Sequence, residues 1–196
     1  MLTTERFTSI KNKYGHWASW AVWAKEGDTP KSNMGDLSIF DLQTNPKVLD
    51  ELNPNIILVG LNISRGSIKN TLGNFHDPRP EAMDFKIRFA LRNTPLWGGY
   101  MTDVIKDFNQ KESGKVAQYL RKNRSFEKAN IEILVDEIDA LGVSNPTVVA
   151  FGNEAYSILL RNMKNKYEIV KLSHYSAYSS KETYREEALE LSLTLD

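Results

Sequence analysis

The residues best suited to chemistry in this sequence are polar side chains gathered in three short segments. Asn62 and Ser64 lie in the first segment, Asn74 in the second, and His174 and Ser176 in the third. Carboxamide, hydroxyl and imidazole groups can take part in directed hydrogen bonds, so they can recognise a polar ligand. One of the five is also one of only three histidines in the chain. The three segments are therefore the candidates for a ligand site.

A metal site is an alternative use of the same part of the sequence. His76 and Asp77 could combine with Asp103 and His174, because imidazole and carboxylate ligands suit divalent ions. The sequence has none of the compact His-x-x-x-His spacings that place two ligands on one helical face. It also lacks cysteine, a Walker loop, a Gly-x-Gly-x-x-Gly motif and a Gly-x-Ser-x-Gly elbow. We therefore expect a site that needs no metal and no other cofactor.

Four strands are predicted to position these segments. Residues 55–60 and 147–152 are short apolar runs preceded by proline, typical of strands buried on both faces of a parallel sheet. Weaker strand patterns cover residues 100–105 and 167–172. Helical spacing predicts helices at 81–92, 114–121, 131–141, 155–163 and 181–193. This order predicts an α/β fold: a three-layer α/β/α sandwich with a mainly parallel central sheet.

The N-terminal segment is rich in tryptophan and is predicted to form a helix over residues 4–24. Trp17, Trp20 and Trp23 recur every third residue and would share one rough helical face. Such a face could act as a stacking platform, but the expected role is to seal the core. No repeat or flexible linker divides the chain, so we expect one domain over residues 1–196.

The predicted strand ends determine where the site should lie. Ligands of open α/β sheets bind beyond the carboxyl ends of the strands. Residues 60–64 follow the first predicted strand and residues 173–176 follow the last. The two segments should therefore line one cleft, although more than 100 residues separate them.

These segments resemble motifs of the uracil-DNA glycosylase superfamily. Its mismatch-specific and single-strand-selective branches carry Gly-x-Asn-Pro after the first strand and His-Pro-Ser after the last. The matching residues here are Gly60, Asn62, His174 and Ser176. Asn74-Phe75-His76 and Tyr100-Met101-Thr102-Asp103 lie between them in the family order, and Ile63 and Tyr175 replace the two motif prolines. The resemblance extends over roughly residues 55–176.

The resemblance implies a DNA base N-glycosylase with a uracil-DNA glycosylase-like fold. Asn62 would orient the attacking water and His174 would bind the base oxygen as negative charge develops there. Phe75 would stack on the extruded base and Asn74 would read its Watson–Crick edge. The remaining implied substrate-binding residues are Gly60, Leu61, Ser64 and Ser176. DNA or another nucleobase-containing ligand is the implied partner.

Each assignment has a structural alternative. Asn62 could make a local Asx-type backbone bond, and His174 could be a hydrogen-bonded loop histidine. Phe75 could belong to the core, and Asn74 could begin a turn. On the same fold, the protein could also be a non-catalytic binder of a nucleotide or single strand, which the two replaced prolines and the neutral charge favour. An altered loop can misplace the reacting water, so binding could survive without catalysis.

Charge and hydropathy limit the kinds of partner that the sequence favours. The chain has 25 Lys and Arg against 25 Asp and Glu, so it lacks the basic excess of a typical nucleic-acid binder. Any phosphate contact would come from a local patch, and the candidates are Arg121, Lys122, Arg124 and Lys128. A solvated helical surface is the alternative for that patch. No apolar run approaches the ~18–20 residues of a membrane span, so we expect no membrane partner and a cytoplasmic location.

Overall fold

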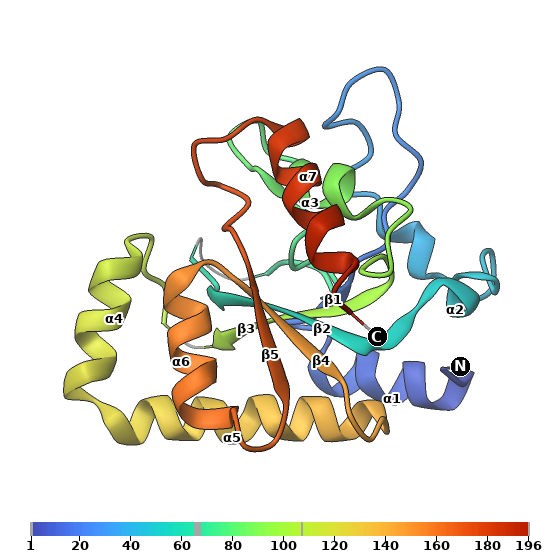
Figure 1. Ribbon diagram of the computed structural model, residues 1–196. Helices are drawn as coiled ribbons and strands as arrows, with labels where there is room; N and C mark the ends of the chain where they lie inside the picture. The colour runs from blue at the N-terminus through green and yellow to red at the C-terminus, as the bar shows by residue number, and fades with distance from the viewer. Residues whose placement is uncertain (1, 65–67, 107, 196) are drawn as a thin grey trace.

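The computed structural model describes residues 2–64, 68–106 and 108–195. These residues form a five-stranded sheet in the order β1-β3-β2-β4-β5 (Figure 1). Only β1 runs antiparallel, against β3, and the other neighbours pair in parallel. The prediction of an α/β fold with a mainly parallel sheet is confirmed. The strands are β1 (Ser19–Trp20), β2 (Asn53–Asn62), β3 (Gly99–Ile105), β4 (Thr147–Phe151) and β5 (Glu168–Leu172).

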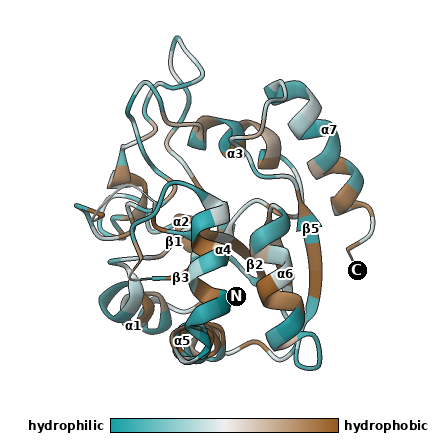
Figure 2. Ribbon diagram, turned by 90° about the vertical axis from the view of Figure 1, so that its left-hand side faces the viewer, coloured by the Kyte–Doolittle hydropathy of each residue, from teal (hydrophilic) through white to brown (hydrophobic). Residues whose placement is uncertain are grey.

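Helices cover both faces of the sheet, an arrangement compatible with a three-layer sandwich (Figure 2). One face carries α1 (Thr4–Tyr14), α5 (Arg124–Leu141) and α6 (Asn153–Met163). The other carries α3 (Asp84–Leu91) and α7 (Lys181–Ser192). The remaining helical elements are a 3-10 turn (Leu37–Phe40), α2 (Val48–Glu51) and α4 (Ser113–Lys122). Within the described ranges, no helix has the length and apolar character needed to span a membrane.

Strand β2 shows why the sheet needs helices on both sides. Its side chains alternate: Ile57 and Val59 join the core beneath α1, α5 and α6, whereas Ile56 and Leu58 join the core beneath α3 and α7. All four are buried, as the continuous apolar run predicts. The predicted strands lie within two residues of the observed ones, and α3 begins three residues later than predicted.

The predicted helix over residues 4–24 is wrong beyond Tyr14. Helix α1 is capped at Gly15, whose N–H donates to the Lys11 carbonyl oxygen at 3.0 Å. Residues 19 and 20 then form β1 on β3. This pairing supplies backbone partners from a distant part of the chain, which helical periodicity in a single segment does not reveal. Trp20 and Trp23 nevertheless belong to the core, with exposed fractions of 0% and 4%.

Candidate functional site

A cavity of about 470 Å³ opens at the carboxyl edge of the sheet, on the side of α3 and α7. Strand register explains part of its wall, because Gly60 of β2 lies opposite Asp103 of β3. The loop after β5 supplies another part of the wall. The lining includes Asn62, Ile63, Ser64, Asn74, Phe75, Asp103, His174, Tyr175 and Ser176. The structure therefore brings the two sequence-distant motif segments into one site.

The loop that carries Phe75 is held by the segment between α1 and β2. Leu72 donates its N–H to the Gly15 carbonyl oxygen at 2.6 Å. The indole N–H of Trp23 donates to the Phe75 carbonyl oxygen at 3.2 Å. Asn74 donates to the Trp17 carbonyl oxygen at 2.7 Å. The N-terminal tryptophan segment thus fixes one wall of the cavity as well as filling core.

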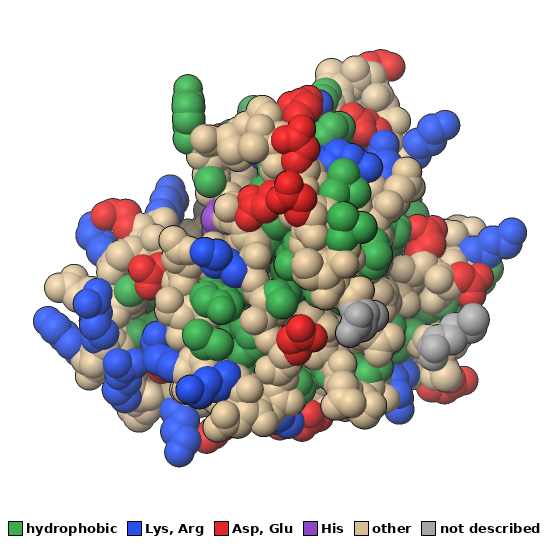
Figure 3. Space-filling model, viewed as in Figure 1, with side chains coloured by type: hydrophobic (Ala, Val, Ile, Leu, Met, Phe, Trp, Pro, Cys, Tyr) green, Lys and Arg blue, Asp and Glu red, His purple; other side chains and the backbone are tan. Residues whose placement is uncertain are grey.

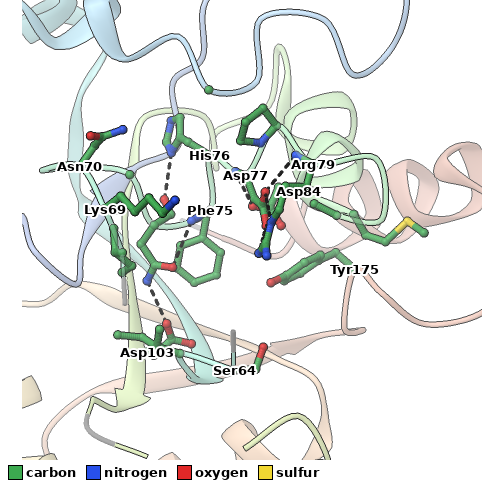
Figure 4. A pocket seen from close by; sticks show the side chains of 18 of the residues that line it. Ser64, Lys69, Asn70, Phe75, His76, Asp77, Arg79, Asp84, Asp103 and Tyr175 are labelled. Atoms are coloured by element: carbon green, nitrogen blue, oxygen red, sulfur yellow. Dashed lines mark hydrogen bonds and ion pairs between the residues drawn. The ribbon is translucent and has the colours of Figure 1, made fainter. Parts of the chain in front are cut away.

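Phe75 occupies an unusual backbone conformation at the cavity wall. Its φ is 62°, in the left-handed region, and its side chain is 5% exposed. Its ring lies 6.1 Å from the Phe151 ring and 6.3 Å from the Tyr175 ring, centroid to centroid. Figure 4 shows the Phe75 ring between Asp103 and Tyr175. A non-glycine residue in this region costs backbone free energy, so the loop and the aromatic cluster must hold it there.

Asp103 is a buried carboxyl group on the cavity wall. It is 4% exposed, and its Oδ2 accepts a hydrogen bond from the Asn74 amide at 2.9 Å. Burial raises the pKa of Asp103 from 3.8 to about 6, although the Asn74 hydrogen bond and the Lys106 charge act to lower it. A Cβ on Gly60 would lie 2.3 Å from Asp103 Oδ1, so glycine is required for this close approach. The result is a carboxyl group that titrates close to neutral pH in a ligand-sized cavity.

Asn62 has its amide orientation fixed by two backbone carbonyl oxygens. Its Nδ2 donates to Phe108 at 2.7 Å and to Gln110 at 2.9 Å. Because both partners are acceptors, the nitrogen must face them and the carboxamide oxygen must face the other way. The side chain lines the cavity from the last residue of β2. It therefore presents a hydrogen-bond acceptor whose orientation does not depend on protonation.

His174 has its neutral tautomer set by Ser176. The Ser176 backbone N–H donates to Nδ1 of His174 at 3.2 Å, which places the proton of the neutral ring on Nε2. Desolvation lowers the pKa of His174, so the neutral ring is the favoured form. The Tyr175 ring stacks on it with a centroid distance of 4.5 Å. Gly152, at φ 86°, lets the chain pass close by, since a Cβ there would lie 3.1 Å from His174 Cβ.

Asn74 and His76 make their hydrogen-bonding contacts within the protein. Both amide hydrogens of Asn74 are used within the protein, on Trp17 and Asp103, so its amide group has no hydrogen left for reading a base edge. His76 is 3% exposed, with Nδ1 2.9 Å from the Asn74 carbonyl oxygen and Nε2 3.0 Å from the Val22 carbonyl oxygen.

The alternative two-histidine metal site is contradicted by this geometry. Both ring nitrogens of His76 face backbone carbonyl oxygens inside the protein, so neither faces a metal position. Among residues 2–64, 68–106 and 108–195, no three His, Asp or Glu side chains are grouped so as to hold a metal ion.

Two other predicted contacts lie outside the cavity lining. The Leu61 side chain is buried in the core beneath α1, α5 and α6, on the opposite face of the sheet. Gly60 lies behind the wall, where it makes room for Asp103 and for the Phe75 ring, 3.2 Å from its absent Cβ. Their motif positions thus shape the wall without touching a ligand through a side chain.

The predicted basic patch lies on α4 and the first turns of α5. Figure 3 shows Lys and Arg side chains gathered on the side where Figure 1 places these helices. Arg124 is paired with Glu127 at 3.2 Å, which offsets part of its charge. The backbone of residues 108–110, whose carbonyl groups accept from Asn62, precedes α4 in the chain. The four predicted side chains, Arg121, Lys122, Arg124 and Lys128, are all exposed.

Asp103 is the functional candidate that sequence reasoning left out of its glycosylase site. A usable signal was present, because Asp103 is the one charged residue in the strand pattern of residues 100–105. An acidic residue at the carboxyl end of a strand buried on both faces costs free energy, and functional sites are where that cost is found. Its near-neutral titration depends on burial by other segments, which the strand pattern does not specify.

Comparison with known proteins adds no further assignment. No model of a protein family and no curated protein matches this chain.

Proposed function

We propose that this chain hydrolyses the N-glycosidic bond of a nucleobase in DNA and has a uracil-DNA glycosylase-like fold. The observation that carries the proposal is the shared cavity of Asn62 and His174, in which one presents an oriented acceptor and the other a neutral N–H donor. Base loss by hydrolysis needs both kinds of group. One must hold the water, and the other must stabilise negative charge on the departing base.

Each step has a residue suited to it. The carboxamide oxygen of Asn62 orients the water, while the Nε2–H of His174 donates to the base oxygen as the bond breaks. Phe75 and Tyr175 provide aromatic surface against which an extruded base can pack. Ionised Asp103 places negative charge in the cavity and so stabilises the oxocarbenium-like sugar. Ser64 and Ser176 supply further polar groups at the wall.

A non-catalytic binder of a base or nucleotide is the second candidate. Tyr175 favours it, because its ring stacks on His174 at a position where the resembling families carry proline. A stack of this kind can restrict how closely a base approaches the His174 donor, and a displacement of about 1 Å is enough to reduce turnover strongly.

One experiment separates the two candidates. The purified protein, treated with chelator, is incubated with labelled single-stranded and double-stranded oligonucleotides carrying uracil, hypoxanthine or a mismatched base. Alkali then cleaves the strand at every abasic site. Strand breaks that depend on protein support the glycosylase. Oligonucleotide binding without breaks on any substrate contradicts it and supports the binder.

Phe75 is expected to contribute to affinity through stacking. Replacement by leucine keeps an apolar side chain but removes the aromatic face, so affinity for a single-stranded oligonucleotide should fall about 5-fold or more. Fluorescence anisotropy measures the change. The matched control is Phe151→Leu, because Phe151 packs on the same ring but does not line the cavity. Equal affinities for Phe75→Leu and the wild type would remove Phe75 from the site.

Phosphate contacts are expected to be few, because the net charge is zero. The slope of log affinity against log salt should therefore be shallow. Replacing Arg121 and Arg124 together by alanine should reduce the slope by up to about 2, since each side chain that binds a phosphate adds about 1 to it. The charge-matched control replaces Lys11 and Lys13 of α1 by alanine. An identical slope in the wild type and the Arg121/Arg124 variant would exclude the α4–α5 patch from the interface.

A further inference from the structure

A buried ion pair lies directly behind Asp103, between β3 and α5. Lys106 Nζ is 2.6 Å from Glu137 Oε1, and both side chains are 0% exposed. Lys106 also donates to Thr102 Oγ1 at 2.6 Å and to the backbone carbonyl oxygen of Asp103. Tyr100 donates its hydroxyl to the other Glu137 oxygen at 2.9 Å. The ammonium group thus has three acceptors, one of which belongs to the cavity residue itself.

Helix α5 is built to receive this network. Glu137 and Asn130 are seven residues apart, which places them two turns apart on the same helix face. Asn130 accepts the backbone N–H of Lys106 at 2.8 Å, while Glu137 takes the Lys106 side chain. Lys106, which directly follows β3, is consequently held at its backbone and at its side-chain tip.

Stability alone is a poor explanation for such a pair. Moving two charges out of water carries a large desolvation cost for each ion, and well-packed apolar residues of similar volume are often equally stabilising or better. Strand β3 and helix α5, which flank the pair, contribute the apolar side chains of Val104 and Leu134 to the buried core. The feature that an apolar replacement would not supply is a fixed charge that is hydrogen-bonded to the Asp103 backbone.

We propose that Lys106 and Glu137 are positioning residues for Asp103: the pair fixes the carboxyl end of β3 and places the Lys106 ammonium group behind the Asp103 carboxyl group. The charged groups that act on Asp103 are Lys106, which directly follows β3, and Glu137 of α5, and Lys106 has the stronger effect on its pKa. The other titratable and charged groups of the cavity wall are Lys69, His76, Asp77, Arg79, Asp84 and His174. The assignment of a reaction step to Asp103 rests on the proposed function, but the effect of the pair on its proton affinity does not.

The test is a titration of Asp103 in the intact protein, followed by the NMR signal of its side-chain carboxyl carbon. Lys106→Met removes the positive charge and should raise the pKa of Asp103. Glu137→Gln removes the negative charge and should lower it. The double variant should lie between the two single variants and above the wild type, because Lys106 has the larger effect. Shifts in the same direction for both single variants would indicate a packing effect and overturn the proposal.

The double variant keeps the test decisive if a single variant does not fold. Each single variant leaves one buried charge without its partner and can fail to fold, whereas the double variant removes both charges and should fold. A double variant with an Asp103 pKa equal to or below that of the wild type would by itself contradict the proposal. The control is Arg161→Met. This substitution breaks the ion pair between Arg161 of α6 and Glu127 of α5, the helix that also carries Glu137, and it should leave the Asp103 titration unchanged.

Activity supplies the second readout. In a variant set with measurable cleavage, the pH at which turnover reaches half its maximum should follow the Asp103 pKa, upwards in Lys106→Met and downwards in Glu137→Gln. Shifted NMR titrations without any cleavage would support the role of the pair and contradict the glycosylase. Cleavage in the wild type with unshifted NMR titrations in the folded variants would support the glycosylase and overturn the role of the pair.

Discussion

Replacing Asn62 by alanine is expected to lower the rate of base release by about 100- to 1,000-fold, the loss typical when one preorganised polar group of a transition state is removed. The amide of Asn62 is held by the Phe108 and Gln110 carbonyl oxygens, so its oxygen needs no rearrangement to orient water. Single-turnover measurements on saturating oligonucleotide isolate this step from binding. Affinity for the oligonucleotide should change little, because the interaction acts mainly in the transition state.

The matched control for this variant is Asn70→Ala. Asn70 is another asparagine of the cavity lining, but it lies on the exposed loop side. It should retain most of the wild-type rate. Full activity of Asn62→Ala would show that Asn62 has no part in the reaction, even with the cavity correctly located. Loss of affinity in parallel with loss of rate would indicate instead that the loop carrying Phe108 had moved.

Replacing Asp103 by asparagine is expected to separate activity from stability. The variant keeps the shape of the side chain and can still accept the Asn74 hydrogen bond, but it carries no charge. We expect turnover at pH 7.5 to fall by about 100-fold, within the range found for loss of a catalytic carboxylate. In the wild type, turnover should rise with pH around a midpoint of about 6, which is the pKa of Asp103. The variant should lack this rise.

The same substitution, Asp103→Asn, should lower turnover but raise the stability of the fold. The pKa of Asp103 is higher in the folded protein, about 6, than the ordinary value of 3.8, so the folded state binds the proton more tightly. This contribution to stability is complete below about pH 4 and is lost as the pH rises through about 6. At pH 8 the buried charge should cost up to about 3 kcal/mol. Asp103→Asn should therefore gain free energy of unfolding over the wild type between pH 4 and pH 8.

Urea unfolding at pH 4.5 and pH 8 measures this difference. Asp139→Asn is the control, because Asp139 is an exposed carboxylate paired with Lys166, and its replacement should show no comparable pH-dependent gain. An Asp103→Asn variant that is less stable than the wild type at pH 8 would show that the ionised group is well compensated in the fold. Its assignment as a buried, near-neutral acid would then be wrong.

The apolar pattern of the sequence is sufficient to predict the four parallel strands of the sheet and the meeting of the two motif segments. The apolar runs of β2 and β4 specify strands buried on both faces, because both alternating sets of side chains are apolar. Parallel strands end at one edge, so the residues after β2 and β5 had to converge. Asn62 and His174 line one cavity for that reason.

The use of the polar residues depends on contacts between distant parts of the chain. The end of α1, the pairing of β1 and the anchoring of the Phe75 loop depend on partners far away in the chain, such as Gly15 with Leu72. The same is true of Asn74, which serves Asp103, and of His76, which serves the N-terminal segment. A hydrogen bond or a pKa depends on the atoms that surround a group in space. Sequence periodicity indicates which face of a helix or strand a residue occupies. It does not indicate which distant residues pack against that face.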